Sequence, residues 1–360
     1  MSKKTPASLM APWLRDLKPY SVAEVSGLIK LDAMENPYVF PTELVDDWLA
    51  TLHSAEINRY PDPHSTSLKH ALATQLALPK EASITVGNGS DEIIHMLCLA
   101  FNQPGAKLLA PGPSFAVYPL AAKAVNMEYV EVPLDSKTFE LKTAEFLNAI
   151  REHQPALIFL ASPNNPTANR FADEDIREIA AQTDGLVVLD EAYWRFAGDN
   201  CVSRLFDLEN IVFMHTLSKI GLAGIRLGAL IGRAAWLEPL ERVRMPYNVS
   251  NLTQATACFA IEHAAYFDAQ IEKICASRTT LMNGLKEIGG LEVWPSATNF
   301  ILFRVPGAAP EVHASLLKNG VAIKNLHGGH PSLENCLRVS VGTDEENGEF
   351  LRQLKTICSS

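Results

Sequence analysis

One stretch of the chain is more informative than any other, and it reads Ile211-Val-Phe-Met-His-Thr-Leu-Ser-Lys219-Ile-Gly-Leu-Ala-Gly-Ile-Arg226-Leu-Gly-Ala-Leu-Ile-Gly232. It is apolar and rich in glycine, and its basic groups are His215, Lys219 and Arg226. Burial disfavours an ammonium ion and lowers its pKa, which leaves a nucleophilic amine. Such a lysine can form a Schiff base with a carbonyl group. The alternative is a solvated lysine in a loop between two strands.

Short apolar runs alternate with helical patterns on both sides of this stretch. The runs predict strands at residues 83–86, 107–110, 127–132, 156–161, 186–189, 211–215 and 227–231, and helices include 91–101 and 173–182. This alternation predicts an α/β fold with a mainly parallel sheet covered by helices on both faces. Ligands of such sheets bind at the carboxyl ends of the strands.

The pattern changes after residue 248 and indicates a second domain. Long helical segments are predicted over 252–288, and short strands follow at 300–305, 321–324 and 336–341. We therefore expect a large domain over 41–248 and a smaller α+β domain over 249–360. Four prolines lie within the first 40 residues, which are predicted to form an extended arm and not a core element, with part of the arm joining the small domain.

Composition excludes several classes of protein. The chain has 360 residues, 47% of them hydrophobic, and a formal net charge of −10 without a dense basic run, which argues against nucleic-acid binding. No apolar run indicates a secretory signal or a membrane span. The six cysteines show no CxxC spacing and no accompanying histidine cluster, so free thiols in a reducing compartment are expected, without a metal site. The sequence predicts a cytoplasmic protein.

Polar residues follow the predicted strands, where a ligand is expected. The segment Gly87-Asn-Gly-Ser-Asp91 contains Gly89, Ser90 and Asp91 and opens an apolar helix. Glycine permits close approach of the backbone, and a helix N-terminus offers free amides to an anion. The alternative for this segment is an ordinary helix cap.

An acidic residue, an arginine and two hydroxyl groups also lie at or near the ends of the predicted strands. Asp190 ends a buried strand, where an acid needs a partner such as a protonated pyridine nitrogen, although it could instead cap the next turn. Arg226 could pair with a phosphate, and Thr216 and Ser218 add hydroxyl groups near Lys219; the alternative is a packed arginine and two turn residues. Together with Tyr193, these are the parts of a pyridoxal 5'-phosphate site.

The order of the motifs resembles a known family. Ser162-Pro-Asn-Asn-Pro-Thr167, Asp190-Glu-Ala-Tyr193 and Thr216-Leu-Ser-Lys219 resemble the fold-type I aminotransferases of the class II group. Four further motifs resemble the histidinol-phosphate aminotransferases: Asn36-Pro-Tyr38, Arg59-Tyr-Pro-Asp-Pro63, Pro113-Ser-Phe-Ala-Val-Tyr118 and Cys336-Leu-Arg-Val-Ser-Val-Gly-Thr343. The resemblance covers nearly the whole chain and implies a seven-stranded, mainly parallel sheet in the large domain.

The resemblance also implies a role for individual residues. Lys219 is expected to carry pyridoxal phosphate, and Asp190 to pair with its ring nitrogen. Asn165 and Tyr193 are expected at its phenolic oxygen, and Phe115 on its ring. The implied phosphate contacts are Gly89, Ser90, Asp91, Thr216, Ser218 and Arg226, with Tyr60 reaching the other subunit's cofactor in a homodimer. The implied substrate contacts are Tyr20, Asn36, Asn299, Lys324 and Arg338.

Three positions depart from the family pattern. Phe115 stands where tyrosine is common, Arg226 follows Lys219 by seven residues where many relatives have eight, and Lys324 replaces an arginine. Lysine keeps the charge but loses the bidentate fork.

The function implied is amino transfer between L-histidinol phosphate, or its keto form imidazole acetol phosphate, and glutamate or 2-oxoglutarate, in histidine synthesis. Three alternatives remain open at this point. They are an aromatic or broad-specificity aminotransferase, a decarboxylase of phosphorylated amino acids, and a cofactor-binding regulator without turnover.

Overall fold

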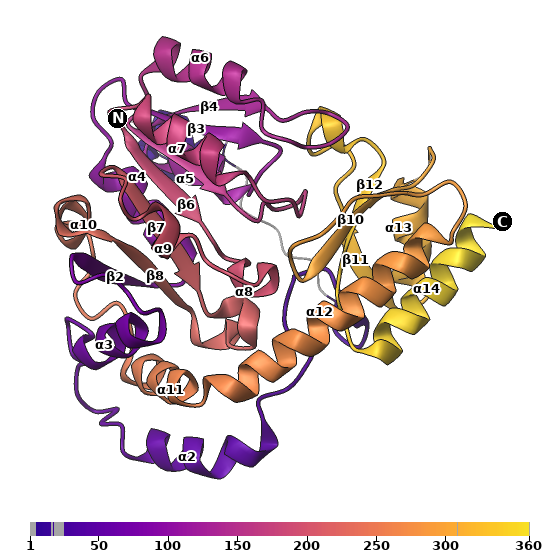
Figure 1. The fold of residues 1–360 in the computed structure, drawn as a ribbon, viewed down its shortest axis with the longest axis horizontal. Coiled ribbons are helices and arrows are strands. Elements are labelled where there is room, and N and C mark those ends of the chain that lie inside the picture. Colours follow the sequence, from indigo (N-terminus) through magenta and orange to yellow (C-terminus); the bar gives the residue numbers. More distant parts are fainter. Residues whose placement is uncertain (1–4, 16, 18–24, 308, 360) are drawn as a thin grey trace.

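The computed structural model describes residues 5–15, 17, 25–307 and 309–359, which form two β-sheets flanked by helices (Figure 1). The larger sheet has seven strands within the described residues, in the order β2-β8-β7-β6-β5-β3-β4. Its strands are β2 (Ala82–Asn88), β3 (Lys107–Gly112), β4 (Glu128–Pro133), β5 (Leu157–Ala161), β6 (Leu186–Asp190), β7 (Ile211–Thr216) and β8 (Leu227–Arg233). Only β8 runs antiparallel to its two neighbours, which confirms the predicted mainly parallel sheet.

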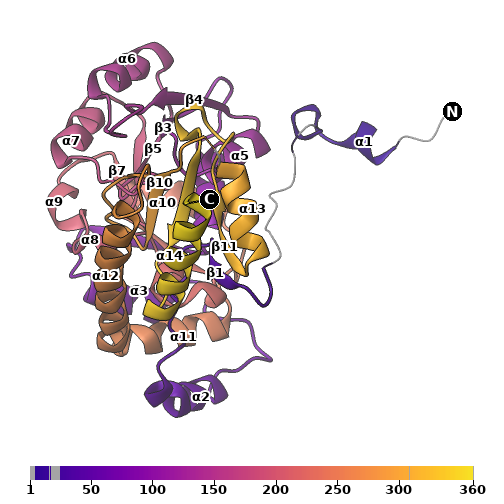
Figure 2. The same ribbon diagram turned by 90° about the vertical axis from the view of Figure 1, so that its right-hand side faces the viewer.

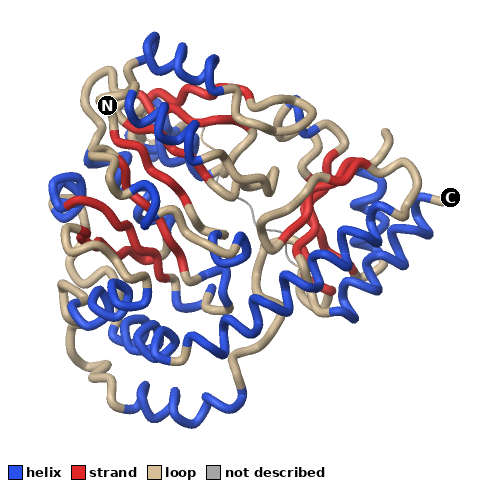
Figure 3. The backbone as a smooth tube through the Cα atoms, viewed as in Figure 1, coloured by secondary structure: helices blue, strands red, loops and turns tan. Residues whose placement is uncertain are grey.

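The large sheet is buried on both faces because successive strand residues enter different cores. In β5, Leu157 and Phe159 pack on one side, whereas Ile158 and Leu160 pack on the other. The first face is covered by α4 (Ser90–Ala100), α5 (Val117–Ala124) and α10 (Ala234–Glu241). The second face is covered by α3 (Thr66–Gln75), α6 (Thr143–His153), α7 (Asp173–Ala181) and α9 (Val202–Leu205), as the blue helices of Figure 3 show.

The smaller sheet has the order β1-β11-β12-β10-β9. Its strands are β1 (Ile29–Leu31), β9 (Glu292–Val293), β10 (Phe300–Arg304), β11 (Val321–Asn325) and β12 (Cys336–Ser340). The long α12 (Ala264–Lys286) packs against it together with α13 (Ala309–Lys318) and α14 (Asp344–Cys358). The helix α14 begins with a capping box between Thr343 and Glu346, which satisfies two backbone donors at its start.

The N-terminal arm is predicted to be extended and not a core element, with part of it joining the small domain, and the structure makes its β1 a buried strand of the small sheet. This strand pairs in parallel with β11, and Leu31 is only 1% exposed. Three residues are too few to show a periodic pattern, so the pairing was not visible in the sequence. Figure 2 shows α1 (Pro6–Leu9), by contrast, projecting away from the body of the protein.

The helix that follows the predicted domain boundary also differs from expectation. α11 (Asn251–Glu262) packs on α3 and on α2 (Val45–His53), beside the large sheet, although it lies after residue 248. The division of the chain into domains remains a prediction.

The other short elements are α8 (Trp194–Ala197), η1 (Pro12–Leu14), η2 (Thr42–Leu44), η3 (Ser218–Ile220), η4 (Ala223–Ile225) and η5 (Pro331–Leu333). Across the described ranges, we find no helix with the length and apolar character that crossing a bilayer requires.

Candidate active site

A pocket lies at the carboxyl ends of the parallel strands of the large sheet, where the sequence predicts a ligand. Most of the predicted cofactor contacts line it, drawn from five separate segments of chain: Ser90, Asp91, Phe115, Asn165, Asp190, Tyr193, Thr216, Ser218 and Lys219. They meet because parallel strands deliver their ends to one edge of a sheet. The structure therefore brings together residues that are up to 129 positions apart in the chain.

Lys219 lies in η3, directly after β7, and its Nζ is 5.7 Å from the centre of the Tyr193 ring. Burial lowers the pKa of this lysine to about 8, and the positive charges of Arg338 and Arg226 contribute in the same direction. The ordinary value is 10.5. At neutral pH about a tenth of this side chain is therefore a free amine, which is the nucleophilic form and is far more than an ordinary lysine offers.

Asp190 is the last residue of β6 and is buried, with 5% of its surface exposed. Burial raises the pKa of its carboxyl group from 3.8 to about 6, although hydrogen bonds from the Tyr118 hydroxyl and the Ala192 amide oppose the rise. The Tyr118 hydroxyl lies 2.6 Å from Asp190 Oδ2, and the Ala192 nitrogen lies 3.1 Å from Oδ1. A buried carboxylate of this kind is stabilised by a cationic partner such as a protonated ring nitrogen.

Tyr118 is a site residue to which sequence reasoning assigned no role. It is fully buried in α5, and its ring packs edge-on against Phe115 at 5.6 Å between centroids. The sequence signal that could have identified Tyr118 is its position three residues after Phe115. Side chains with this spacing lie on the same side of a helical turn.

A chain of hydrogen bonds joins the two sheets across the pocket. Arg338 of β12 donates from Nη1 to Asn165 Oδ1 at 2.6 Å and from Nη2 to the Asp32 carbonyl at 2.8 Å. Asn165 Nδ2 in turn lies 3.3 Å from the Tyr193 hydroxyl. Burial of Tyr193 raises the pKa of its hydroxyl, so it remains a donor at neutral pH. The large-sheet loops and the small sheet thus share one polar network.

The N-terminus of α4 offers a cradle for an anion. Gly89 precedes the helix at a φ of +83°, and a Cβ built on it would lie only 2.6 Å from Arg226 Nη2. A Cβ on Gly228 would lie 2.6 Å from the Ser90 backbone nitrogen. Gly89 therefore leaves room for the Arg226 side chain beside the helix end, and Gly228 lets β8 pack closely against it. The free amides of α4, together with the hydroxyls of Thr216 and Ser218, fit a phosphate group.

Arg226 reaches this cradle despite its short distance in sequence from Lys219. The intervening chain is compressed into η3 and η4, and Arg226 itself adopts a left-handed conformation with φ +51°. Its Nη1 lies 3.4 Å from Ser218 Oγ, and its Nη2 forms an ion pair with Asp91 Oδ2 at 3.1 Å. The Asp91 carboxylate is therefore paired with Arg226, and the group that Asp91 can offer an anion is its backbone amide.

The predicted substrate contacts divide into two groups. Lys324 and Arg338 face each other on adjacent antiparallel strands, and both line two cavities that continue from Phe115. The side chain of Asn36 instead contacts Gln270 at 2.9 Å and the Ile220 carbonyl at 3.2 Å, and Asn299 is fully buried and donates to the Met34 carbonyl. Asn36 thus supports neighbouring segments of chain, whereas Oδ1 of Asn299 has no hydrogen-bond partner within the described residues. The contact of these two residues with the substrate stays a prediction.

The two remaining predicted residues are Tyr20 and Tyr60. Tyr20 falls outside the described residues. Tyr60 is 79% exposed and stacks on Tyr247 at 4.4 Å between ring centroids, and it does not line the pocket of its own chain.

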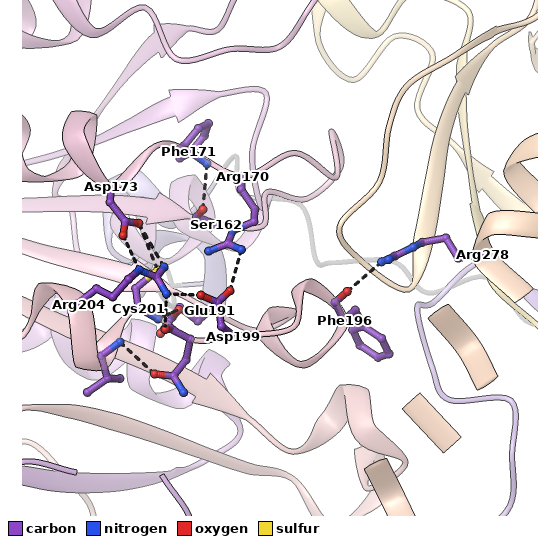
Figure 4. A network of polar contacts seen from close by, with 12 residues as sticks. Ser162, Arg170, Phe171, Asp173, Glu191, Phe196, Asp199, Cys201, Arg204 and Arg278 are labelled. Carbon is purple, nitrogen blue, oxygen red and sulfur yellow. Dashed lines mark hydrogen bonds and ion pairs between the residues drawn. The ribbon is translucent and has the colours of Figure 1, made fainter. Parts of the chain in front are cut away.

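A second layer of polar contacts holds the strand ends in place (Figure 4). Glu191, which follows Asp190, accepts from the Cys201 amide at 2.7 Å and is 2.9 Å from His215 Nε2 on β7. Arg204 pairs with Asp173, and Arg278 of α12 donates to the Phe196 carbonyl at 3.1 Å. The segment after β6 is thus tied to β7 through the buried contact of Glu191 with His215 and to α12 through Arg278.

No cluster of three or more His, Cys, Asp or Glu side chains suited to a metal ion occurs among the described residues. All six cysteines are free thiols, and burial raises the pKa of each for which a shift is resolved, including Cys98 and Cys201 to about 12. Such thiols are poor nucleophiles at neutral pH. Lys219 is therefore the nucleophile that the pocket provides.

The family model, the relatives and the solved structure that match this chain are all aminotransferases. The family model described as aminotransferase class I and II matches residues 26–354. A histidinol-phosphate aminotransferase 2 of Nitrosococcus oceani is 46% identical over 99% of both chains, and one of Cupriavidus pinatubonensis is 47% identical over 94% of this chain and 93% of that one. A crystal structure of histidinol-phosphate aminotransferase from Sinorhizobium meliloti in complex with pyridoxal 5'-phosphate has the same fold, with a TM-score of 0.87 at 23% identity and 98% coverage of each chain.

Proposed function

The chain belongs to the class I and II aminotransferase family, and from this premise we propose that it transfers an amino group between L-histidinol phosphate and 2-oxoglutarate. The products are imidazole acetol phosphate and glutamate, and the reaction belongs to histidine biosynthesis. The proposal is supported by near full-length relatives that carry this name. Within the structure, it depends on one observation, the opposed pair Lys324 and Arg338 beside the Lys219 pocket.

The cofactor is pyridoxal 5'-phosphate, and the donor set of the pocket fits it. Lys219 would hold it covalently, Asp190 would face its ring nitrogen, and Phe115 would lie on the ring. Asn165 and Tyr193 would donate to its phenolic oxygen. The cradle at the start of α4, with Thr216, Ser218 and Arg226, would hold its phosphate. When bound, this group supplies an aldehyde that captures amines and an electron-poor ring that draws electrons from the substrate's Cα.

The residues of the chain perform the remaining tasks. Lys219 Nζ takes the proton from the substrate's Cα, because a pKa lowered to about 8 makes its uncharged, basic form accessible near neutral pH. Asp190 holds a proton on the ring nitrogen by charge, and Tyr118 fixes the carboxylate in one orientation by its 2.6 Å hydrogen bond. Arg338 binds the anionic group of either substrate. A guanidinium suits both the phosphate of histidinol phosphate and the α-carboxylate of glutamate.

We further propose a cytoplasmic homodimer in which each subunit completes the site of the other. The observation that supports this is the exposed aromatic pair of Tyr60 and Tyr247, since 79% of Tyr60 is uncovered in the single chain. Large aromatic side chains with this exposure are enriched at protein interfaces. We assign Tyr60 to the phosphate of the partner's cofactor.

A transamination assay tests the proposed function directly. The purified enzyme is supplied with 2-oxoglutarate and with histidinol phosphate, phenylalanine or threonine phosphate as the amino donor. We expect the highest kcat/KM for histidinol phosphate. A higher value for phenylalanine would indicate an aromatic aminotransferase, and carbon dioxide release from threonine phosphate would indicate a decarboxylase.

A further inference from the structure

One wall of the substrate cavity carries a carboxylate that the proposed chemistry does not use. The cavity beside Arg338 is also lined by Glu131 and Tyr129 of β4 and by His330 from the loop after β11. It shares Phe115 and Asn165 with the Lys219 pocket, so the two spaces adjoin at these side chains. A substrate whose amino group reacts at Lys219 therefore has this cavity open to its side chain.

The Glu131 carboxylate is held in a defined position. His330 Nε2 lies 3.0 Å from Glu131 Oε1. This contact joins β4 of the large sheet to the loop between β11 and β12, two strands of the small sheet (Figure 1). The Tyr129 hydroxyl also bonds to Glu131, and the negative charge of Glu131 adds to burial in raising the pKa of that tyrosine. Glu131 additionally lies across Gly112, where a Cβ would come within 2.1 Å of its Cδ.

The protonation of His330 follows from its other contact. The Ser332 amide donates to His330 Nδ1 at 3.1 Å, so Nδ1 is the acceptor nitrogen and Nε2 carries the proton. Nε2 therefore donates to Glu131, which acts as the acceptor. A carboxylate accepts about four hydrogen bonds, so Tyr129 and His330 leave acceptor capacity for a donor in the cavity.

The lining of the cavity consequently carries charges of opposite sign, which come from different sheets. Lys324 and Arg338 of the small sheet provide positive charge, and Glu131 of the large sheet provides negative charge. The lining also includes the apolar residues Phe115, Ala116, Pro119 and Leu333. Such a space is complementary to a molecule with an anionic group, a flat ring and an N–H donor on that ring.

We propose that Glu131 is a specificity-determining residue that accepts a hydrogen bond from the imidazole N–H of the substrate, and that His330 and Tyr129 position it. This proposal rests on the proposed function and assigns the ring end of the same substrate. A benzene ring has no donor for Glu131, so it would cover the remaining acceptor positions of the carboxylate without supplying a hydrogen bond. The distal carboxylate of glutamate meets a like charge there, so glutamate must direct its side chain elsewhere.

The test compares two substrates that differ only in the ring. Histidinol phosphate is assayed beside phenylalaninol phosphate, which keeps the phosphate and the amine but replaces imidazole by benzene. We expect the wild type to favour the imidazole compound in kcat/KM by about tenfold to a hundredfold, the range of a hydrogen bond to a charged group. In Glu131→Gln most of this preference should be lost, through a higher KM for histidinol phosphate and little change in kcat.

Controls separate the subsite from the fold and from the proposed function. Glu128→Gln removes a carboxylate from the same strand, where Glu128 is 57% exposed in its side chain and pairs with Lys107, and it should leave the ring preference intact. Gly112→Ala should displace the Glu131 side chain and reduce the preference as Glu131→Gln does. In Glu131→Gln, kcat/KM for glutamate should be retained or rise, which shows that the cofactor site is intact.

The assays with the two phosphorylated amines separate a failure of the Glu131 proposal from a failure of the proposed function. A wild type that uses both phosphorylated amines, with the same ring preference in Glu131→Gln, overturns the role of Glu131 and leaves the proposed function standing. A wild type that uses neither compound overturns both proposals.

Discussion

Tyr118 donates a 2.6 Å hydrogen bond to Asp190 at the end of a strand of the large sheet, and both side chains are buried. The bond joins α5 to the end of β6 across 72 residues of sequence. It lowers the pKa of the Asp190 carboxyl group against the larger effect of burial, which raises it. The tyrosine thus helps to keep Asp190 ionised, which is the form that can hold a proton on a ring nitrogen.

Tyr118→Phe should therefore weaken the hold on the cofactor. Without the hydroxyl, the pKa of Asp190 rises further above its present value of about 6, so less of the carboxylate is ionised near neutral pH. We expect affinity for pyridoxal phosphate to fall by a factor that matches ~1.5–3 kcal/mol, the range for a hydrogen bond to a charged group. Fluorescence titration of the apoprotein between pH 6 and 8 measures this, and the loss should be greatest at pH 6. Equal affinity of variant and wild type across that range would contradict the role.

Asp190→Asn should have opposite effects on activity and on stability. The variant should bind the cofactor yet lose far more than threefold in rate, since removal of a hydrogen bond to a charged group costs well over ~1 kcal/mol in the transition state.

The stability effect follows from the pKa of Asp190 in the folded protein, which lies above the ordinary 3.8. The contribution of this group to the free energy of unfolding is complete below pH 4 and is lost as pH rises through about 6. The apoprotein of the variant should accordingly resist urea better than wild type at pH 7, by up to ~3 kcal/mol. A rate within threefold of wild type would remove Asp190 from the mechanism.

Lys219 should be the residue that carries the cofactor. Lys219→Ala should lose nearly all turnover, and borohydride reduction of the wild type should leave the cofactor mass on the peptide that contains Lys219. Because the pKa of this lysine is lowered to about 8, the rate of covalent attachment to the apoprotein should rise as pH increases through 8 and level off above it. Label on a different lysine, or a rate that still rises steeply between pH 9 and 10, would refute the assignment.

The opposed pair of Lys324 and Arg338 should discriminate between the two substrates. Arg338→Ala should damage both half-reactions, since either anion requires it. Lys324→Ala should raise the KM for histidinol phosphate far more than for glutamate, by a factor matching ~1–3 kcal/mol, because a phosphate has more charge and more acceptor oxygens than a carboxylate. Steady-state kinetics with each substrate varied in turn measure the difference. Small and equal changes for both substrates would mean that Lys324 does not contact the phosphate.

The dimer should be required for activity. Tyr60→Ala should reduce affinity for pyridoxal phosphate although Tyr60 does not line the pocket of its own chain. Analytical ultracentrifugation at the assay concentration, with activity measured on the same sample, tests this. A fully active monomer would rule out the shared site.

The sequence by itself was enough to predict the large sheet and most of the residues at its strand ends. All seven strands of that sheet lie within a few residues of their predicted positions, because most of them are buried, continuous apolar runs and this signal is local. The motifs around Asn165, Asp190 and Lys219 were equally visible, since each lies directly after a strand and needs no distant partner to be recognised.

Tertiary structure alone decided the contacts between distant segments. The bond from Tyr118 to Asp190, the link from Arg338 to Asn165 and the contact between His330 and Glu131 join residues 72, 173 and 199 positions apart. The same holds for β1, whose three residues become part of a core only because β11 lies beside them. Hydrophobic periodicity reports which face of an element is buried, but it carries no information about which other element covers that face. Those pairings arise from packing of the whole chain, and they decide how Asp190 is kept charged and which side chains surround the substrate.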